Sequence, residues 1–122
     1  MKRDLDLIRD MLLRIEDISN GARLICVEDF TDLCDDRHSI SYHLELLEDA
    51  GYIAVIDHPY TDDYKDFALT RLTMLGADYL DSVRNNSIWR KVKDKLEKVG
   101  NDASLKIVCD VATSIMKQQL GI

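Results

Sequence analysis

Residues 39–53 read SISYHLELLEDAGYI, and this stretch decides the fold. Its apolar positions are spaced four and three residues apart, as in an amphipathic helix: Ile40, Leu44 and Leu47. Gly51 follows, and glycine readily adopts the left-handed conformation that ends a helix. Residues 52–56 are then a short β-favouring run. The stretch therefore predicts a helix that turns abruptly into a strand.

A second β-favouring run lies at residues 67–72, after a polar stretch at 59–65 that is rich in turn formers. Two such runs joined by a loop predict an antiparallel hairpin with a long, exposed tip. Thr73 can cap a further helix, because its hydroxyl can accept a hydrogen bond from the open amides at a helix start. The local order is therefore helix, hairpin, helix.

The rest of the chain shows helical periodicity interrupted by short breaks. Helices are predicted over residues 3–17, from a cap at Asp35 or Asp36 to 50–51, from a cap at Ser87 to Gly100, and over 104–120. A brief strand is predicted over 24–27, and a short helix or turn over 28–36.

These elements predict a mainly α protein with a small β-hairpin (α+β). The order favours a winged helix-turn-helix core over residues 1–84, followed by two C-terminal helices over 85–122. With 122 residues the chain has the size of one domain. The C-terminal helices are therefore expected to belong to the same domain or to serve as a dimerisation element, and a homodimer is a possible assembly.

Four strings extend the pattern: MKRDLDLIR at residues 1–9, SYHL at 41–44, LTMLG at 72–76 and SIWRKVK at 87–93. Together they resemble a family of uncharacterised small bacterial and phage proteins, catalogued as a domain of unknown function. The resemblance covers nearly the whole chain. It implies a winged-helix core with a helical extension and a frequent setting in phages and prophages. The family brings no established activity or catalytic residues to carry over.

Charge is unevenly distributed along the chain. Residues 1–84 hold nineteen acids and nine bases, a balance of −10, whereas residues 85–122 hold four acids and seven bases, a balance of +3. An acidic body repels phosphate chains and membrane surfaces and attracts basic protein patches. The partner is therefore either DNA, as the fold suggests, or a basic protein surface, as the charge suggests.

A nucleic-acid-binding regulator is the first hypothesis, because a winged helix that reads DNA normally offers basic residues from its second helix and its wing. The candidate contacts are Arg37, His38, Ser41, Tyr42, Lys65, Lys91, Lys93 and Lys95. The presumed reading helix argues against this hypothesis, since residues 35–51 hold five acids and one base.

The second hypothesis is an acidic protein–protein interaction module, for example a phage protein that acts on a host protein. Its candidate contacts are Glu45, Asp49, Asp62 and Asp63. Such a module would present these carboxylates to a basic surface of the partner. The sequence leaves both hypotheses open.

Catalytic and metal-binding patterns are missing from the sequence, so neither an enzyme nor a cofactor is expected. Cys34 and His38 could share a helix face, but His43 would point to nearly the opposite side, which leaves zinc without enough ligands. The chain has no Gly-rich phosphate loop and no Gly-x-Ser-x-Gly elbow. Its three cysteines lack a Cys-x-x-Cys pair and are expected to be buried thiols: Cys26, Cys34 and Cys109.

Membrane and secretion signals are absent too. No apolar run approaches the roughly 20 residues of a membrane-spanning helix, and the chain start lacks a hydrophobic secretion segment. We therefore expect a cytoplasmic protein that does not associate with a membrane.

Overall fold

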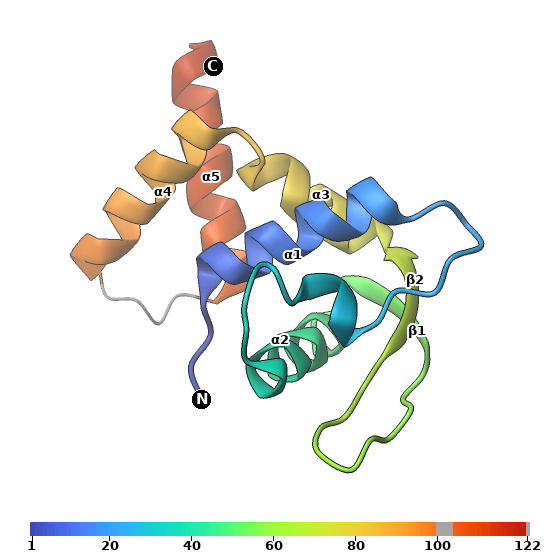
Figure 1. Ribbon diagram of the computed structural model, residues 1–122. Helices are drawn as coiled ribbons and strands as arrows, with labels where there is room; N and C mark the ends of the chain where they lie inside the picture. Colours follow the sequence, from blue (N-terminus) through green and yellow to red (C-terminus); the bar gives the residue numbers. More distant parts are fainter. Residues whose placement is uncertain (100–103, 122) are drawn as a thin grey trace. The chain divides into compact units, whose positions relative to one another are not determined.

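The computed structural model describes residues 1–99 and 104–121 of the chain (Figure 1). Its first helix, α1, spans Leu5–Ile18 and confirms the predicted helix. Asp4 caps this helix, because its carboxylate accepts a hydrogen bond of 3.1 Å from the backbone N–H of Leu7. The buried apolar side chains of α1 form one stripe: Leu7, Ile8, Met11, Leu12 and Ile15.

The segment after α1 forms a single β-bridge and a short 3-10 helix, η1 (Val27–Phe30). Ile25 exchanges both backbone hydrogen bonds with Leu69, at 2.8 and 3.0 Å. The strand predicted over residues 24–27 is therefore wrong except for the single bridge at Ile25. The predicted short helix or turn after it is present as η1.

Two carboxylates explain why the strand stops at one bridge. Asp29 accepts a hydrogen bond of 2.9 Å from the backbone N–H of Cys26. Asp66 accepts one of 3.0 Å from the backbone N–H of Val27. A longer strand would have offered such N–H groups to a neighbouring strand, so these side chains compete with sheet formation.

The second helix, α2 (Arg37–Asp49), confirms the prediction made from the deciding stretch. Asp36 caps it by accepting a hydrogen bond of 3.0 Å from the backbone N–H of His38. Gly51 follows with φ at +76°, the left-handed conformation that lets the chain leave the helix abruptly. The predicted apolar stripe is fully buried: Ile40, Leu44 and Leu47.

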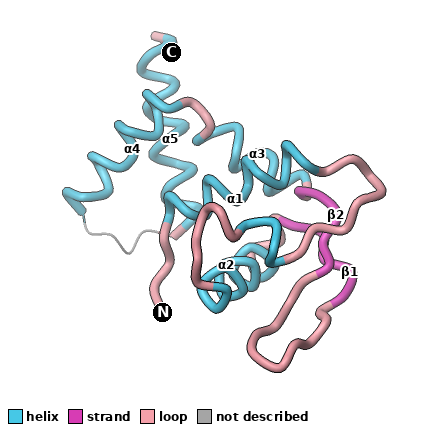
Figure 2. The backbone as a smooth tube through the Cα atoms, in the orientation of Figure 1, coloured by secondary structure: helices cyan, strands magenta, loops and turns pink. Residues whose placement is uncertain are grey.

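The predicted hairpin is present (Figure 2). Strand β1 (Ile53–Asp57) pairs antiparallel with β2 (Ala68–Leu72), and the pairing is irregular on both sides of Val55. The segment between the strands, residues 58–67, is called the hairpin loop below. Together with the helices it makes the chain a mainly α protein with a small antiparallel hairpin, as predicted.

Helix α3 (Met74–Val83) leaves the hairpin through Thr73, as predicted. The Thr73 hydroxyl accepts a hydrogen bond of 3.2 Å from the backbone N–H of Gly76, and it donates one to the carbonyl of Gly51. Gly76 lies so close to the end of α2 that an added Cβ would be 2.1 Å from the carbonyl oxygen of Tyr52. The start of α3 is therefore fixed to the segment that follows α2.

The chain forms two units, Met1–Ala77 and Asp78–Ile122. The division falls inside α3, whereas the sequence pattern placed the boundary after residue 84. The second unit contains α4 (Asn86–Val99) and α5 (Leu105–Leu120), which pack against each other.

The start of α4 differs from its prediction. The Asn85 carboxamide, and not the Ser87 hydroxyl, accepts a hydrogen bond from the first turn, 3.0 Å from the backbone N–H of Ile88. Asn85 is the capping residue because the helix begins at Asn86, two residues earlier than a cap at Ser87 would allow. The predicted end of this helix at Gly100 lies outside the described residues. Helix α5 confirms the helix predicted over 104–120, and Ser104 is its cap.

The three cysteines are free thiols, and each is half-buried. The expectation of buried thiols is therefore wrong, since none of the three lies fully inside. Within the described residues, no helix combines the length and the apolar character that crossing a membrane requires.

Candidate interaction surfaces

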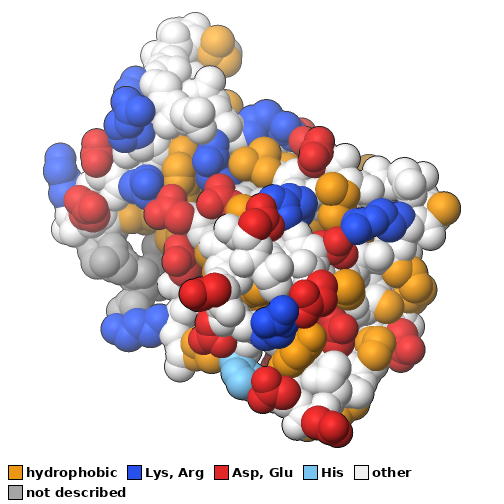
Figure 3. Space-filling view, viewed as in Figure 1, with side chains coloured by type: hydrophobic (Ala, Val, Ile, Leu, Met, Phe, Trp, Pro, Cys, Tyr) orange, Lys and Arg blue, Asp and Glu red, His pale blue; other side chains and the backbone are white. Residues whose placement is uncertain are grey.

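Acidic side chains dominate the surface formed by α2 and the hairpin loop, which we call the acidic face. Residues 35–66 hold nine acids and two bases, a balance of −7 that equals the net charge of the whole chain. Figure 3 shows red carboxylates over both α2 and the loop. All four residues of the protein-binding hypothesis are exposed on this face: Glu45, Asp49, Asp62 and Asp63.

The hairpin loop is bonded to one side of α2. Four α2 residues spaced three or four apart contact the loop: His38, Ser41, Glu45 and Glu48. In the middle of this stripe, the Ser41 hydroxyl donates a hydrogen bond of 2.6 Å to the carbonyl of Lys65. The Lys65 ammonium lies 3.7 Å from the Glu45 carboxylate and 5.3 Å from the centre of the Phe67 ring.

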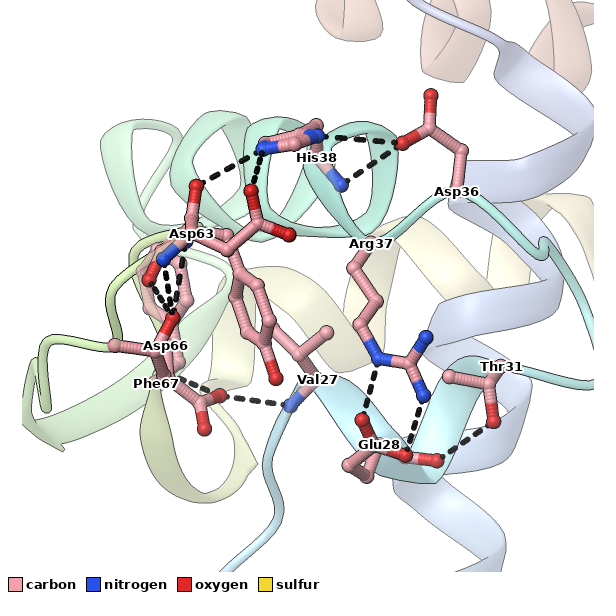
Figure 4. Close-up of polar contacts among 11 residues, drawn as sticks. Val27, Glu28, Thr31, Asp36, Arg37, His38, Asp63, Asp66 and Phe67 are labelled. Atoms are coloured by element: carbon pink, nitrogen blue, oxygen red, sulfur yellow. Dashed lines mark hydrogen bonds and ion pairs between the residues drawn. The ribbon is translucent and has the colours of Figure 1, made fainter.

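His38 joins the start of α2 to the tip of the loop (Figure 4). Its Nε2–H donates a hydrogen bond of 2.9 Å to the carbonyl of Asp63, whose carboxylate lies 3.2 Å from the same nitrogen. The Asp36 carboxylate lies 3.7 Å from Nδ1. The Asp63 carbonyl, and then the charges of Asp63 and Asp36, raise the pKa of the His38 imidazole above its ordinary value.

Arg37 binds η1. Its Nε and Nη2 both donate to the Glu28 carboxylate, a two-point ion pair that Figure 4 also shows. The hydrogen bond from Arg37 lowers the pKa of the Glu28 carboxyl below its ordinary value, and the same bond raises the pKa of Arg37. The positive charge of Arg37 is therefore matched by a carboxylate.

At the far end of the stripe, His58 Nε2–H donates to the Glu48 carboxylate at 2.8 Å. The His58 ring packs edge-on against Phe67, with 5.3 Å between the ring centres. The Asp66 carboxylate accepts a hydrogen bond of 2.8 Å from the backbone N–H of Phe67. The other end is joined to η1, because Asp66 also accepts the hydrogen bond from the backbone N–H of Val27. Both ends of the loop are thus bonded to neighbouring elements of the first unit.

The eight residues of the nucleic-acid hypothesis fall into two groups. Five lie on α2 and the loop: Arg37, His38, Ser41, Tyr42 and Lys65. The Ser41 side chain is buried, and Tyr42 is half-buried with its ring edge-on to His43 at 5.4 Å. The other three, Lys91, Lys93 and Lys95, lie on α4 in the second unit. The structure therefore does not describe these eight residues as one site.

The three α4 lysines differ in their surroundings. Lys91 and Lys95 are exposed. Lys93 is half-buried, and its ammonium lies 6.0 Å from the centre of the Trp89 ring. Lys93 is therefore held against an aromatic side chain.

Sequence reasoning did not single out the polar partners Glu28 and Glu48. Each lies nine or ten residues from the side chain that it binds and belongs to another element. Helical periodicity reports only neighbours within one helix, so it holds no signal for such pairs.

The two histidines considered as zinc ligands have other partners. His43 is buried: its Nδ1–H donates to the Ser39 carbonyl at 2.7 Å, and its Nε2 accepts a hydrogen bond of 2.9 Å from the backbone N–H of Asp4. Across residues 1–99 and 104–121, no group of three His, Cys, Asp or Glu side chains is placed to hold a metal ion.

Comparison with known proteins gives one family and one relative. The family model described as "Hypothetical protein (DUF2513)" matches residues 2–102. An "Uncharacterized protein" of Haemophilus influenzae is 35% identical over 121 residues, which cover 99% of this chain and 100% of the relative. No solved structure matches the chain.

Proposed function

Since the chain belongs to the DUF2513 family of hypothetical proteins, which assigns it no activity, we propose a function from the geometry. The protein is a non-enzymatic binding module, and its acidic face recognises a basic surface on a partner protein. The proposed setting is the one that the resemblance implies, a phage or prophage protein that acts on a host protein in the cytoplasm.

The fold proposed for this module is a winged helix. The order α1, bridge at Ile25, η1, α2, hairpin and α3 supports it. Leu69 of β2 pairs with Val55 of β1 and also with Ile25. Ile25 therefore lies where the winged-helix architecture has an additional short strand. In this arrangement α2 takes the position of the reading helix, and the hairpin loop takes that of the wing.

The observation that carries the proposal is the pairing of the basic side chains on the acidic face. Arg37 is bonded to Glu28, and Lys65 lies beside Glu45. Of the four exposed carboxylates of this hypothesis, Glu45 faces Lys65 and Asp63 faces His38. Within the described residues no ion pair involves Asp49 or Asp62, so these two add uncompensated negative charge to a segment, residues 35–66, whose balance is −7. A surface of this kind attracts basic protein patches and repels phosphate chains.

The bonded loop also supports recognition by a preformed surface. The hydrogen bonds of His38, Ser41 and His58 hold the loop against α2 before any partner arrives. A partner then does not have to order the loop, which lowers the entropic cost of association.

The competing proposal is a nucleic-acid-binding regulator that uses the same face. It would require Arg37 and Lys65 to leave their carboxylates and Ser41 to leave its buried position. Each carboxylate near a duplex would also oppose binding by repulsion. We therefore favour the basic protein partner for this face.

A fluorescein-labelled Lys- and Arg-rich peptide of about 20 residues tests the proposal by anisotropy at low salt. We expect D62N/D63N to weaken binding about five- to tenfold, from the loss of two exposed charge pairs. The matched control D78N/D110N changes the net charge equally at two exposed residues of the second unit and should shift binding less than twofold. Equal weakening by both variants, or no binding of the peptide to the original chain, would overturn the proposal.

A further inference from the structure

We propose a second binding site, for the phosphodiester backbone of nucleic acid, in the groove between α4 and α5. From α4 the groove is lined by Lys91, Lys95 and Lys98, with Asp94 among them, and from α5 by Gln118 and Gln119. The site lies wholly within the second unit and does not depend on the acidic face.

The three groove lysines lie on one side of α4. They are spaced four and three residues apart, so their side chains leave the helix on the same face. At a rise of about 1.5 Å per residue, they span about 10 Å of helix axis. All three are exposed, and their ammonium groups can therefore reach a ligand in the groove.

The three groove lysines differ from Arg37 and Lys65 in whether a carboxylate lies beside them. In the part of the chain that the structure describes, no ion pair joins Lys91, Lys95 or Lys98 to a carboxylate. By contrast, Arg37 and Lys65 lie beside glutamates. The groove lysines thus keep their positive charge available.

The charge of the helix pair matches an anionic ligand. Helix α4 holds five bases and two acids, and α5 holds two bases and one acid, which gives the pair a balance of +4. Figure 3 shows blue side chains spread along α4. Asp94 opposes an anion, but three ammonium groups around it leave the groove with a net positive charge.

The chemistry of the lining favours a nucleic-acid backbone over an acidic peptide. Phosphate oxygens accept hydrogen bonds from ammonium groups and from neutral side-chain amides such as those of Gln118 and Gln119. One strand of a duplex carries a phosphate about every 3.4 Å along the axis. The three lysines, which span about 10 Å, can therefore contact three successive phosphates whatever the base sequence. A peptide would need a run of acidic residues to do the same.

The direct test is the binding of a fluorescein-labelled 20-base-pair mixed-sequence duplex to the full chain between about 50 and 200 mM salt. The variant K91Q/K95Q/K98Q removes the three groove charges. The matched control K2Q/K106Q/K117Q removes three lysine charges outside the groove lining. We expect the groove variant to lower the slope of log affinity against log salt by about 2.7, whereas the control retains most of the slope.

A second variant, Q118E/Q119E, keeps the lysines and places negative charge in the groove. It should weaken duplex binding at least about tenfold with an unchanged circular dichroism spectrum, because each added carboxylate repels phosphate. D62N/D63N should bind the duplex at least as well as the original chain, so a failure here is distinct from a failure of the acidic-face proposal.

Three results would overturn this inference. The first is no duplex binding by the original chain at about 50 mM salt. The second is equal loss of binding in the groove variant and its control. The third is displacement of the duplex by polyglutamate at equal charge concentration, which would identify an acidic peptide as the ligand.

Discussion

The Ser41 hydroxyl donates a 2.6 Å hydrogen bond to the main-chain carbonyl of Lys65, and this bond joins the middle of α2 to the hairpin loop. The two residues are 24 positions apart in sequence, and the Ser41 side chain is buried. The bond therefore fixes how the loop lies on α2, and with it the shape of the acidic face.

Replacement of Ser41 by alanine should lower the free energy of unfolding by about 1 to 2 kcal/mol, because the Lys65 carbonyl loses a partner in a partly buried position. Urea denaturation measures this loss, and hydrogen exchange of the loop amides should speed up. The control S114A changes an exposed serine of α5 and should stay within about 0.5 kcal/mol. Equal stability of both variants would contradict the role assigned to Ser41.

His38 should make stability depend on pH. Its pKa in the folded chain is raised above the ordinary value of 6.5, chiefly by the hydrogen bond to the Asp63 carbonyl. Protonated His38 therefore stabilises the fold fully below the unfolded pKa, and this contribution is lost as pH rises through the raised folded pKa.

The difference in urea midpoint between the original chain and H38Q should therefore be largest near about pH 5.5, where the facing carboxylates of Asp36 and Asp63 are still ionised. Near about pH 9 the part of the difference that depends on the imidazolium charge should be lost. In an NMR titration, the imidazole signal that the original chain shows and H38Q lacks identifies the titration of His38. A difference that does not vary with pH would contradict the prediction.

Gly76 should tolerate no side chain, because an added Cβ would lie 2.1 Å from the backbone oxygen of Tyr52. We expect G76A to cost about 3 kcal/mol or more, since backbone atoms must move. Gly21 offers a matched control: an added Cβ there meets nothing within 4 Å, but φ is +85°. Thermal unfolding should show that G21A costs only about 1 to 2 kcal/mol. Similar losses in both variants would mean that the close approach of α3 to Tyr52 is not rigid.

Substitution of His43 by leucine should destabilise the start of α1. The change keeps an apolar side chain in a buried position but leaves the Asp4 N–H and the Ser39 carbonyl without their partner, at a cost of about 1 to 3 kcal/mol. Chemical denaturation gives the magnitude, and faster hydrogen exchange near Asp4 gives the location. H58L, at a partly exposed histidine, should cost less. The prediction is wrong if H43L and H58L are equally stable.

Much of the fold was predictable from local pattern. The helices around Ile8, Leu44 and Val108 and the hairpin follow from apolar spacing and turn residues, because burial along one element leaves a periodic trace in the sequence. The caps Asp36 and Thr73 were also predictable, since a cap bonds within three residues of itself. The failures at Ser87 and at residues 24–27 arose where a neighbouring polar side chain offered a competing bond.

The sequence by itself determined the acidic and basic halves of the chain, the mainly α character and the hairpin, because these depend on composition and on short-range spacing. Only the tertiary structure decided that Arg37 binds Glu28, that His58 binds Glu48, and that Ser41 is buried under the loop. Such contacts join elements that are separate in sequence, and their geometry depends on how those elements pack. The charge of a face can thus be read from residue types, but which of its charges remain unpaired is settled only in the folded chain.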